Sequence, residues 1–121
     1  MANHPIVHVE IPAANTAEAA KFYNALFDWK MRYEESVDYH MFTPQVGPGG
    51  GFVALGDNKP GDVLVYVDSD DIDADLARVE QLGGKIVQPK MEIPHTGWFG
   101  IFTDPTGNRM ALYTAMEESQ G

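Results

Sequence analysis

Apolar and polar residues alternate at the start of the chain, which predicts a β-strand over residues 6–11. Period-two geometry puts Val7, Val9 and Ile11 on one face of this strand and His8 and Glu10 on the other. The apolar face needs cover from a helix. The two polar side chains then face away from that helix.

A helix is predicted from about residue 16 to about Phe27. Asn15 and Glu18 form a capping box, in which each side chain satisfies a backbone N–H at the helix start. The apolar residues at spacings of three, four and seven are Ala19, Phe22, Tyr23 and Leu26. This periodicity predicts that they form the buried stripe of the helix.

Three further strands complete the first half of the pattern. Short runs at 29–35 and 39–43 predict two strands joined by a polar turn, and residues 52–55 predict a fourth strand. The glycine-rich residues 47–51 are predicted to form a flexible loop. They lack the Lys-Ser/Thr of a phosphate-binding P-loop.

The same order of elements restarts after a Gly/Asp/Asn/Lys/Pro linker at 56–61. A strand at 62–67 precedes an acidic turn and a helix at 72–82, which ends at Gly83-Gly84. The apolar stripe of this helix is Ile72, Leu76, Val79 and Leu82. Three more strands follow, predicted at 85–89, 98–103 and 109–113.

The pattern therefore predicts an α+β fold made of two βαβββ units, at about 1–57 and 58–121, within a single domain, 1–121. Each unit has a sheet covered by a helix on one face only. Pairing the two open faces would give a cup-like mixed sheet with the helices on the outside. Such a cup is suited to a small molecule.

Composition narrows the functional classes. The chain has 121 residues, is 44% hydrophobic and carries a formal net charge of −10. Such a charge repels nucleic acid and anionic lipid, so we expect neither as a partner and no membrane insertion. Cysteine is absent, which excludes thiolate metal sites and favours a reducing, cytoplasmic location. No signal peptide is visible at the N-terminus.

Two segments carry a resemblance to a known family. Residues 8–15, with 21–23 and 26–29, resemble the opening of the glyoxalase/bleomycin-resistance/dioxygenase (vicinal oxygen chelate) superfamily. Residues 97–108, with the Asp-Pro-x-Gly-Asn turn, resemble its closing signature. The resemblance covers nearly the whole chain and implies the cup-shaped fold described above.

The resemblance also implies where metal-using relatives hold a divalent ion. His8 matches the ligand of the first strand, seven residues before the helix cap. Asp62 stands where the second unit often begins with a His, and Ala111 where a Glu is expected. Residues 51–55, on the fourth strand, offer no ligand.

An open divalent site needs about three protein ligands. His8 and Asp62 supply two, so we predict no metal and no cofactor. The alternative is one divalent metal ion held by His8 and Asp62.

Strand alternation suggests which side chains line the cup. The predicted ligand-binding residues are His8, Glu10, Asp62, Tyr66, Trp98, Arg109 and Tyr113. Alternation puts Trp98 and Phe102 on one face of their strand and Phe99 on the other. The sequence leaves both faces as candidates for lining the cup. An alternative reading pairs Arg109 with an acidic residue at the rim and leaves the other residues as cavity lining.

Three functions remain in order of preference. The first is a metal-free small-molecule-binding protein, similar to the drug-sequestering branch of the superfamily. The second is an enzyme, either a lyase or isomerase related to glyoxalase I or a dioxygenase. The third is a partner-binding module. Open sheet edges and apolar rims lead us to expect a homodimer.

Overall fold

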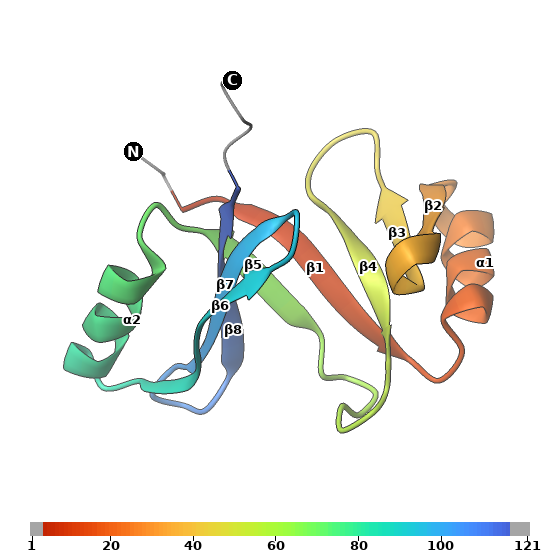
Figure 1. The fold of residues 1–121 in the computed structure, drawn as a ribbon. Coiled ribbons are helices and arrows are strands. Elements are labelled where there is room, and N and C mark those ends of the chain that lie inside the picture. Colours follow the sequence, from red (N-terminus) through yellow and green to blue (C-terminus); the bar gives the residue numbers. More distant parts are fainter. Residues whose placement is uncertain (1–3, 117–121) are drawn as a thin grey trace, which may run out of the picture. The chain divides into compact units, whose positions relative to one another are not determined.

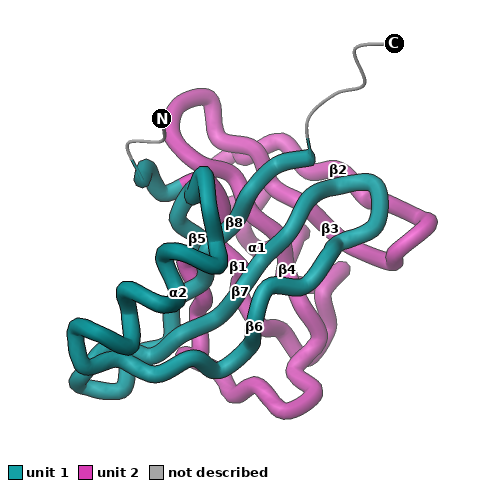
Figure 2. The backbone as a smooth tube through the Cα atoms, turned by 60° about the vertical axis from the view of Figure 1, so that its left-hand side comes forward, with its two compact units in different colours: residues 1–6, 66–121 teal, residues 7–65 magenta. Residues whose placement is uncertain are grey.

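The computed structural model describes residues 4–116 and divides into two compact units (Figure 1). The N-terminal unit is residues 7–65. The C-terminal unit is residues 66–121 together with residues 1–6, of which 4–6 and 66–116 are described (Figure 2). The chain passes between the units twice, after residue 6 and inside the strand β5 (Leu64–Asp68), whereas the sequence predicted units of about 1–57 and 58–121.

The N-terminal unit follows the order strand, helix, three strands. Its elements are β1 (Ile6–Ala13), α1 (Thr16–Phe27), β2 (Lys30–Glu34), a 3-10 turn (Glu35–Val37), β3 (Tyr39–Thr43) and β4 (Gly49–Ala54). The strands lie in the order β2-β3-β4-β1, with β1 and β4 parallel and the other neighbours antiparallel. Asn15 caps α1 as predicted, since its side chain accepts a hydrogen bond from the Glu18 N–H at 2.9 Å.

The C-terminal unit repeats this arrangement. Its elements are β5, α2 (Ile72–Gln81), β6 (Lys85–Ile93), β7 (Gly97–Thr103) and β8 (Arg109–Ala115). Its strands lie in the order β5-β8-β7-β6, with β5 and β8 parallel. The predicted α+β fold of two βαβββ units is confirmed.

The core of the N-terminal unit lies between α1 and one face of its sheet. Ala20, Phe42 and Phe52 are buried at its centre, and Tyr23 packs against them. The predicted stripe of α1 was therefore partly wrong. Phe22 and Leu26 are 60% and 58% exposed, because α1 turns its small Ala20 toward the sheet and leaves the larger residues outside.

The core of the C-terminal unit lies under α2. Ile72, Leu76 and Leu112 are buried there. The residues packed against them are Val67, Ile86, Trp98 and Phe102. The predicted stripe of α2 holds except at Leu82, which follows the last turn and is exposed. Among the described residues, neither helix has the length and apolarity needed to cross a membrane.

Candidate functional site

Strand alternation gives the N-terminal unit a polar face on the side away from α1. Val9 and Ile11 pack against the core under α1, so His8 and Glu10 project from the opposite side of β1. We call this side the open face. The register of β1 with β4 places Gly49 beside His8 and Gly51 beside Glu10.

Three side chains on the open face form a hydrogen-bonded set, which we call the His–Tyr–Glu network. The Tyr39 hydroxyl, from β3, donates to Oε2 of Glu10 at 2.9 Å and lies 3.0 Å from Nε2 of His8. Because the single phenolic proton is directed to Glu10, we assign the proton of this second bond to Nε2 of His8. Sequence reasoning found His8 and Glu10 but missed Tyr39, which joins them.

Gly51 makes room for this network. A Cβ at position 51 would collide with Cζ and the hydroxyl of Tyr39, so the phenol lies across a strand position that has no side chain. A glycine inside a strand often marks such a close approach. The sequence prediction read 47–51 as a loop, whereas β4 already begins at Gly49. The glycine run was therefore the available signal for Tyr39.

Burial controls the charge of His8. The imidazole is half-buried, and its desolvation lowers the pKa below 6.5, while the nearby Glu10 carboxylate partly opposes this by raising it. Desolvation is the larger effect. This lowering of the pKa favours the neutral imidazole, the form that accepts or donates hydrogen bonds without a net charge.

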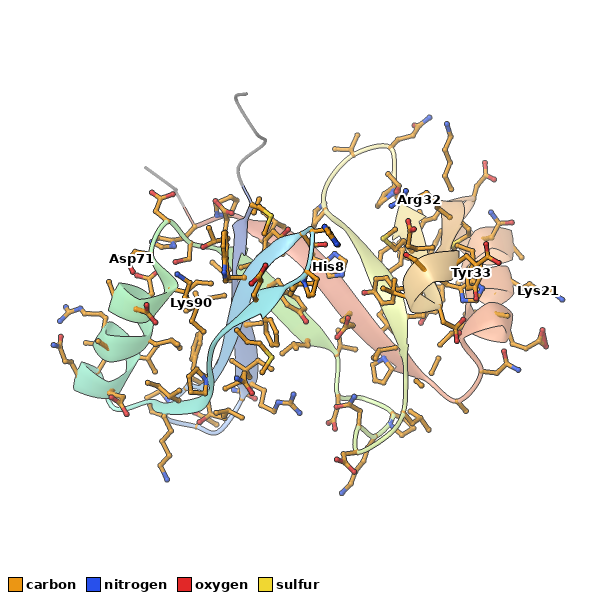
Figure 3. The ribbon with its side chains drawn as sticks, viewed as in Figure 1. His8, Lys21, Arg32, Tyr33, Asp71 and Lys90 are labelled. Atoms are coloured by element: carbon orange, nitrogen blue, oxygen red, sulfur yellow. The ribbon has the colours of Figure 1, made fainter. Side chains whose placement is uncertain are left out.

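A shallow open hollow of about 180 Å³ lies beside the network on the N-terminal unit. It is lined by Val7, His8, Arg32, Met41, Phe42, Thr43, Gly49 and Gly50. Figure 3 shows His8 on β1 and Arg32 on β2. Sequence reasoning did not select Arg32, because only the pairing of β2 with β3 brings it to this hollow.

Asp62 does not lie where the sequence predicted. It is exposed in the turn before β5, and its carboxylate accepts a hydrogen bond from the backbone N–H of Lys59 at 3.0 Å. The strand begins two residues later, at Leu64. Counting seven residues back from the α2 cap, Asp71, also gives Leu64 as the counterpart of His8. Leu64, rather than Asp62, therefore occupies the strand position that corresponds to His8.

Four of the predicted residues, Trp98 among them, lie on the C-terminal unit. Tyr66 pairs with Ala111 across β5 and β8, and Tyr113 shares the face of Ala111. The Tyr113 hydroxyl donates to the Thr96 carbonyl at 3.2 Å, and burial, helped by the charge of Asp68, raises its pKa. Arg109 is exposed at the start of β8.

Trp98 lies on the helix side of the C-terminal sheet. It packs against the cluster under α2, with the Lys90 ammonium 5.4 Å from its ring centre. Alternation then places Phe99 on the open face of that unit. Trp98, a predicted ligand-binding residue, is thus partly buried against the cluster under α2.

The side chains present do not fit a divalent ion. Within residues 4–116 no group of three or more His, Asp or Glu side chains could hold one. Of the predicted ligands, His8 has its Nε2 hydrogen-bonded to Tyr39, and Asp62 accepts a hydrogen bond within its own turn. Leu64 and Ala111 are aliphatic, and Gly51 has no side chain.

Curated relatives carry glyoxylase-like names. A "Glyoxylase-like domain-containing protein" of Didymella fabae is 30% identical over 88% of this chain and 90% of its own length. The "Putative glyoxylase CFP32" of Mycobacterium bovis is 27% identical over 88% of this chain, which spans only 44% of that relative.

Solved structures share the fold at low sequence identity. Methylmalonyl-CoA epimerase from Mycobacterium tuberculosis matches with a TM-score of 0.69 and 15% identity, covering 97% of this chain and 93% of its own. A glyoxalase/bleomycin resistance protein/dioxygenase superfamily member from Vibrio splendidus 12B01 matches with a TM-score of 0.68 and 12% identity, covering 94% and 100%. These likenesses show the fold alone.

The family model of the same superfamily matches residues 5–112, nearly the whole described chain. It covers both βαβββ units, with their two helix caps and the closing Asp-Pro turn. The chain therefore belongs to the Glyoxalase/Bleomycin resistance protein/Dioxygenase superfamily.

Proposed function

We propose that this protein binds a small molecule without a metal ion, on the open face of the N-terminal unit. The observation that carries the proposal is the His–Tyr–Glu network. It holds an imidazole, a phenol and a carboxylate in fixed positions beside a hollow. Small-molecule sites typically combine an apolar surface with a few fixed polar groups of this kind.

The network is organised before any ligand arrives. The phenol bridges two strands that are not neighbours, β1 and β3, and Gly51 on the strand between them leaves space for it. Two hydrogen bonds to one hydroxyl restrict the Tyr39 ring and the His8 ring together. A ligand then loses less conformational entropy on binding than it would at a mobile site.

The alternative, an enzyme with a divalent ion held by His8 and Asp62, is less well supported. Asp62 is engaged in its own turn, two residues before β5 begins at Leu64. The superfamily contains metal-using members, but a shared fold does not transfer their chemistry to this chain.

An NMR screen with a library of small organic fragments tests the proposal. We expect binding fragments to shift the His8 ring signals, and His8→Ala to abolish those shifts. His95→Ala, which removes an exposed histidine from the β6–β7 turn, is the matched control and should leave binding intact. A screen in which no fragment affects His8, or in which binding survives His8→Ala, would refute the site.

Metal content is measured separately. Elemental analysis after mild purification, with calorimetric titration by zinc and nickel, should show far less than one equivalent per chain. One tightly bound equivalent that disappears in His8→Ala would instead favour the metal-dependent enzyme.

A further inference from the structure

Positive charge gathers on one strand of the open face. The chain has 8 Lys and Arg against 18 Asp and Glu. Arg32 pairs with Met41 and Lys30 pairs with Thr43, so both basic residues of β2 share the face of the hollow. Glu34 shares this face and offsets one of the two positive charges, so β2 keeps a net positive charge beside the hollow in an otherwise acidic chain.

Arg32 is held in place by weak contacts only. Its Nη1 is 3.6 Å from Oε1 of Glu34, and its Nη2 is 3.8 Å from Sδ of Met41. A charge-assisted hydrogen bond to a carboxylate is typically about 2.7–2.9 Å long, and a thioether is a weak acceptor. Within residues 4–116, the guanidinium has no polar contact other than these two long ones.

The guanidinium suits a carboxylate better than a spherical anion. Its donors lie in one plane and match the two oxygens of a carboxylate in a bidentate pair. The Met41 thioether and the His8 ring line the same hollow and offer apolar and flat surface to the rest of a ligand. Arg32 lies at the rim, since its side chain is 69% exposed.

The size of the hollow limits the ligand. Its volume of about 180 Å³ is below the ~300–1,000 Å³ of pockets that bury drug-sized molecules. A small planar or short-chain molecule with one charged end fits this description.

We propose that the hollow binds a small organic carboxylate, with the carboxylate on Arg32 and the apolar body against Met41 and the His8 ring. The inference rests on the proposed function, because it names a ligand class for the same site. Glu34 is the internal competitor for the guanidinium, so the ligand replaces a long, exposed ion pair.

An NMR titration with benzoate and with its neutral isostere benzamide tests the charge requirement. We expect the wild-type protein to bind benzoate about tenfold more tightly than benzamide, because only benzoate can form the bidentate ion pair. Arg32→Gln should remove this preference. Arg78→Gln, the same substitution on the exposed face of α2, is the matched control and should keep it.

Two further titrations test the roles of the competitor and of the apolar body. Glu34→Gln should strengthen benzoate binding about two- to threefold, since it removes an exposed ion pair of modest strength. Inorganic phosphate should bind more weakly than benzoate, because it lacks an apolar body.

Equal binding of benzoate and benzamide, or a benzoate preference that survives Arg32→Gln, would overturn this inference. So would phosphate binding as tight as benzoate binding, or no benzoate binding at all. None of these results would by itself refute the proposed function. The proposed function fails only if, in addition, no molecule of the fragment library binds in a way that depends on His8.

Discussion

The two βαβββ units share one topology but differ on their open faces. Counting back from each helix cap, His8 corresponds to Leu64, and Glu10 corresponds to Tyr66. The strand registers agree, because Gly51 faces Glu10 as Ala111 faces Tyr66.

The third member of the network is replaced as well. Met41 pairs with Gly51 and Ile101 pairs with Ala111, so Phe99, two residues before Ile101, is the counterpart of Tyr39. The C-terminal unit thus has leucine, tyrosine and phenylalanine where the N-terminal unit has histidine, glutamate and tyrosine. Both units keep apolar residues packed under their helices, whereas their open faces have diverged, one toward polar groups and the other toward apolar ones.

The two units should differ most in the stability lost when Gly50 or its counterpart Met110 is replaced. A Cβ on Gly50 would collide with the backbone carbonyl oxygen of Val9, which cannot swing away as a side chain can. Gly50→Ala should therefore lower the free energy of unfolding by about 3–5 kcal/mol. Met110→Ala, at a half-buried position, should cost about 1–2 kcal/mol. Urea denaturation measures both, and a smaller loss in Gly50→Ala would contradict the close approach of β1 and β4.

The next largest difference in stability loss is expected for substitutions at Gly51 and Ala111. Gly51→Ala should displace the Tyr39 ring and cost about 2 kcal/mol through the lost network. Ala111→Gly removes a fully buried methyl group and should cost about 1 kcal/mol.

A double-mutant cycle identifies the cause of the Gly51 effect. Once Tyr39→Ala has removed the ring, Gly51→Ala should be nearly neutral, so the two losses will be strongly non-additive. Additive losses would mean that Gly51 is needed for its backbone and not for Tyr39.

Substitutions at the two helix caps should differ less in the stability that they remove. Asn15→Ala and Asp71→Ala each remove one side-chain hydrogen bond to the first turn, to Glu18 and Ala74 respectively, and should each cost about 1 kcal/mol. We expect the larger loss for Asp71→Ala, because its carboxylate also interacts with the helix dipole. Asp71→Asn keeps the hydrogen bond and should recover most of the loss in urea denaturation. Equal stability of Asp71→Asn and Asp71→Ala would show that charge alone matters.

The smallest expected effect is the contribution of His8 to the pH dependence of folding stability. The pKa of His8 is lower in the folded protein than the 6.5 of an unperturbed histidine side chain. Between those two pKa values the unfolded chain binds more protons, so stability falls as the pH drops below 6.5 and is retained above it. His8→Gln should reduce this acid-side loss, as measured by unfolding on either side of pH 6.5.

Glu10→Gln tests the opposing contribution. The Glu10 carboxylate raises the pKa of His8, so its neutralisation should lower that pKa further in an NMR titration of the His8 ring. A rise in the His8 pKa would contradict the assignment of Glu10 as its electrostatic partner.

The sequence predicted the helix caps, the order of elements and the helix-facing residues of β1, because these depend on local patterns. Prediction from the sequence failed where contacts between residues far apart in the chain decide which side chains are buried. The spacing of Phe22 and Leu26 is helical, yet packing of Ala20 against the sheet determines which side of α1 is buried.

The candidate site was predicted only in part for the same reason. Alternation along β1 gave His8 and Glu10, but Tyr39 reaches them only across Gly51, and Arg32 reaches the hollow only through the pairing of β2 and β3. Asp62 was misplaced because the β-branched run after it suggested an earlier strand start than Leu64. Strand register, which one sequence does not specify, was the missing information.

The chain's two tryptophans are divided between the units. Trp29 stacks on Tyr23 and Phe42, with ring centres 5.7 and 4.6 Å apart, whereas Trp98 lies near the Lys90 ammonium. Each half of the molecule thus carries its own intrinsic fluorophore, in a distinct surrounding. Trp29→Phe and Trp98→Phe therefore give proteins whose emission follows one half at a time. Coincident melting of the two signals would identify a single cooperative unit, and separate transitions would identify two.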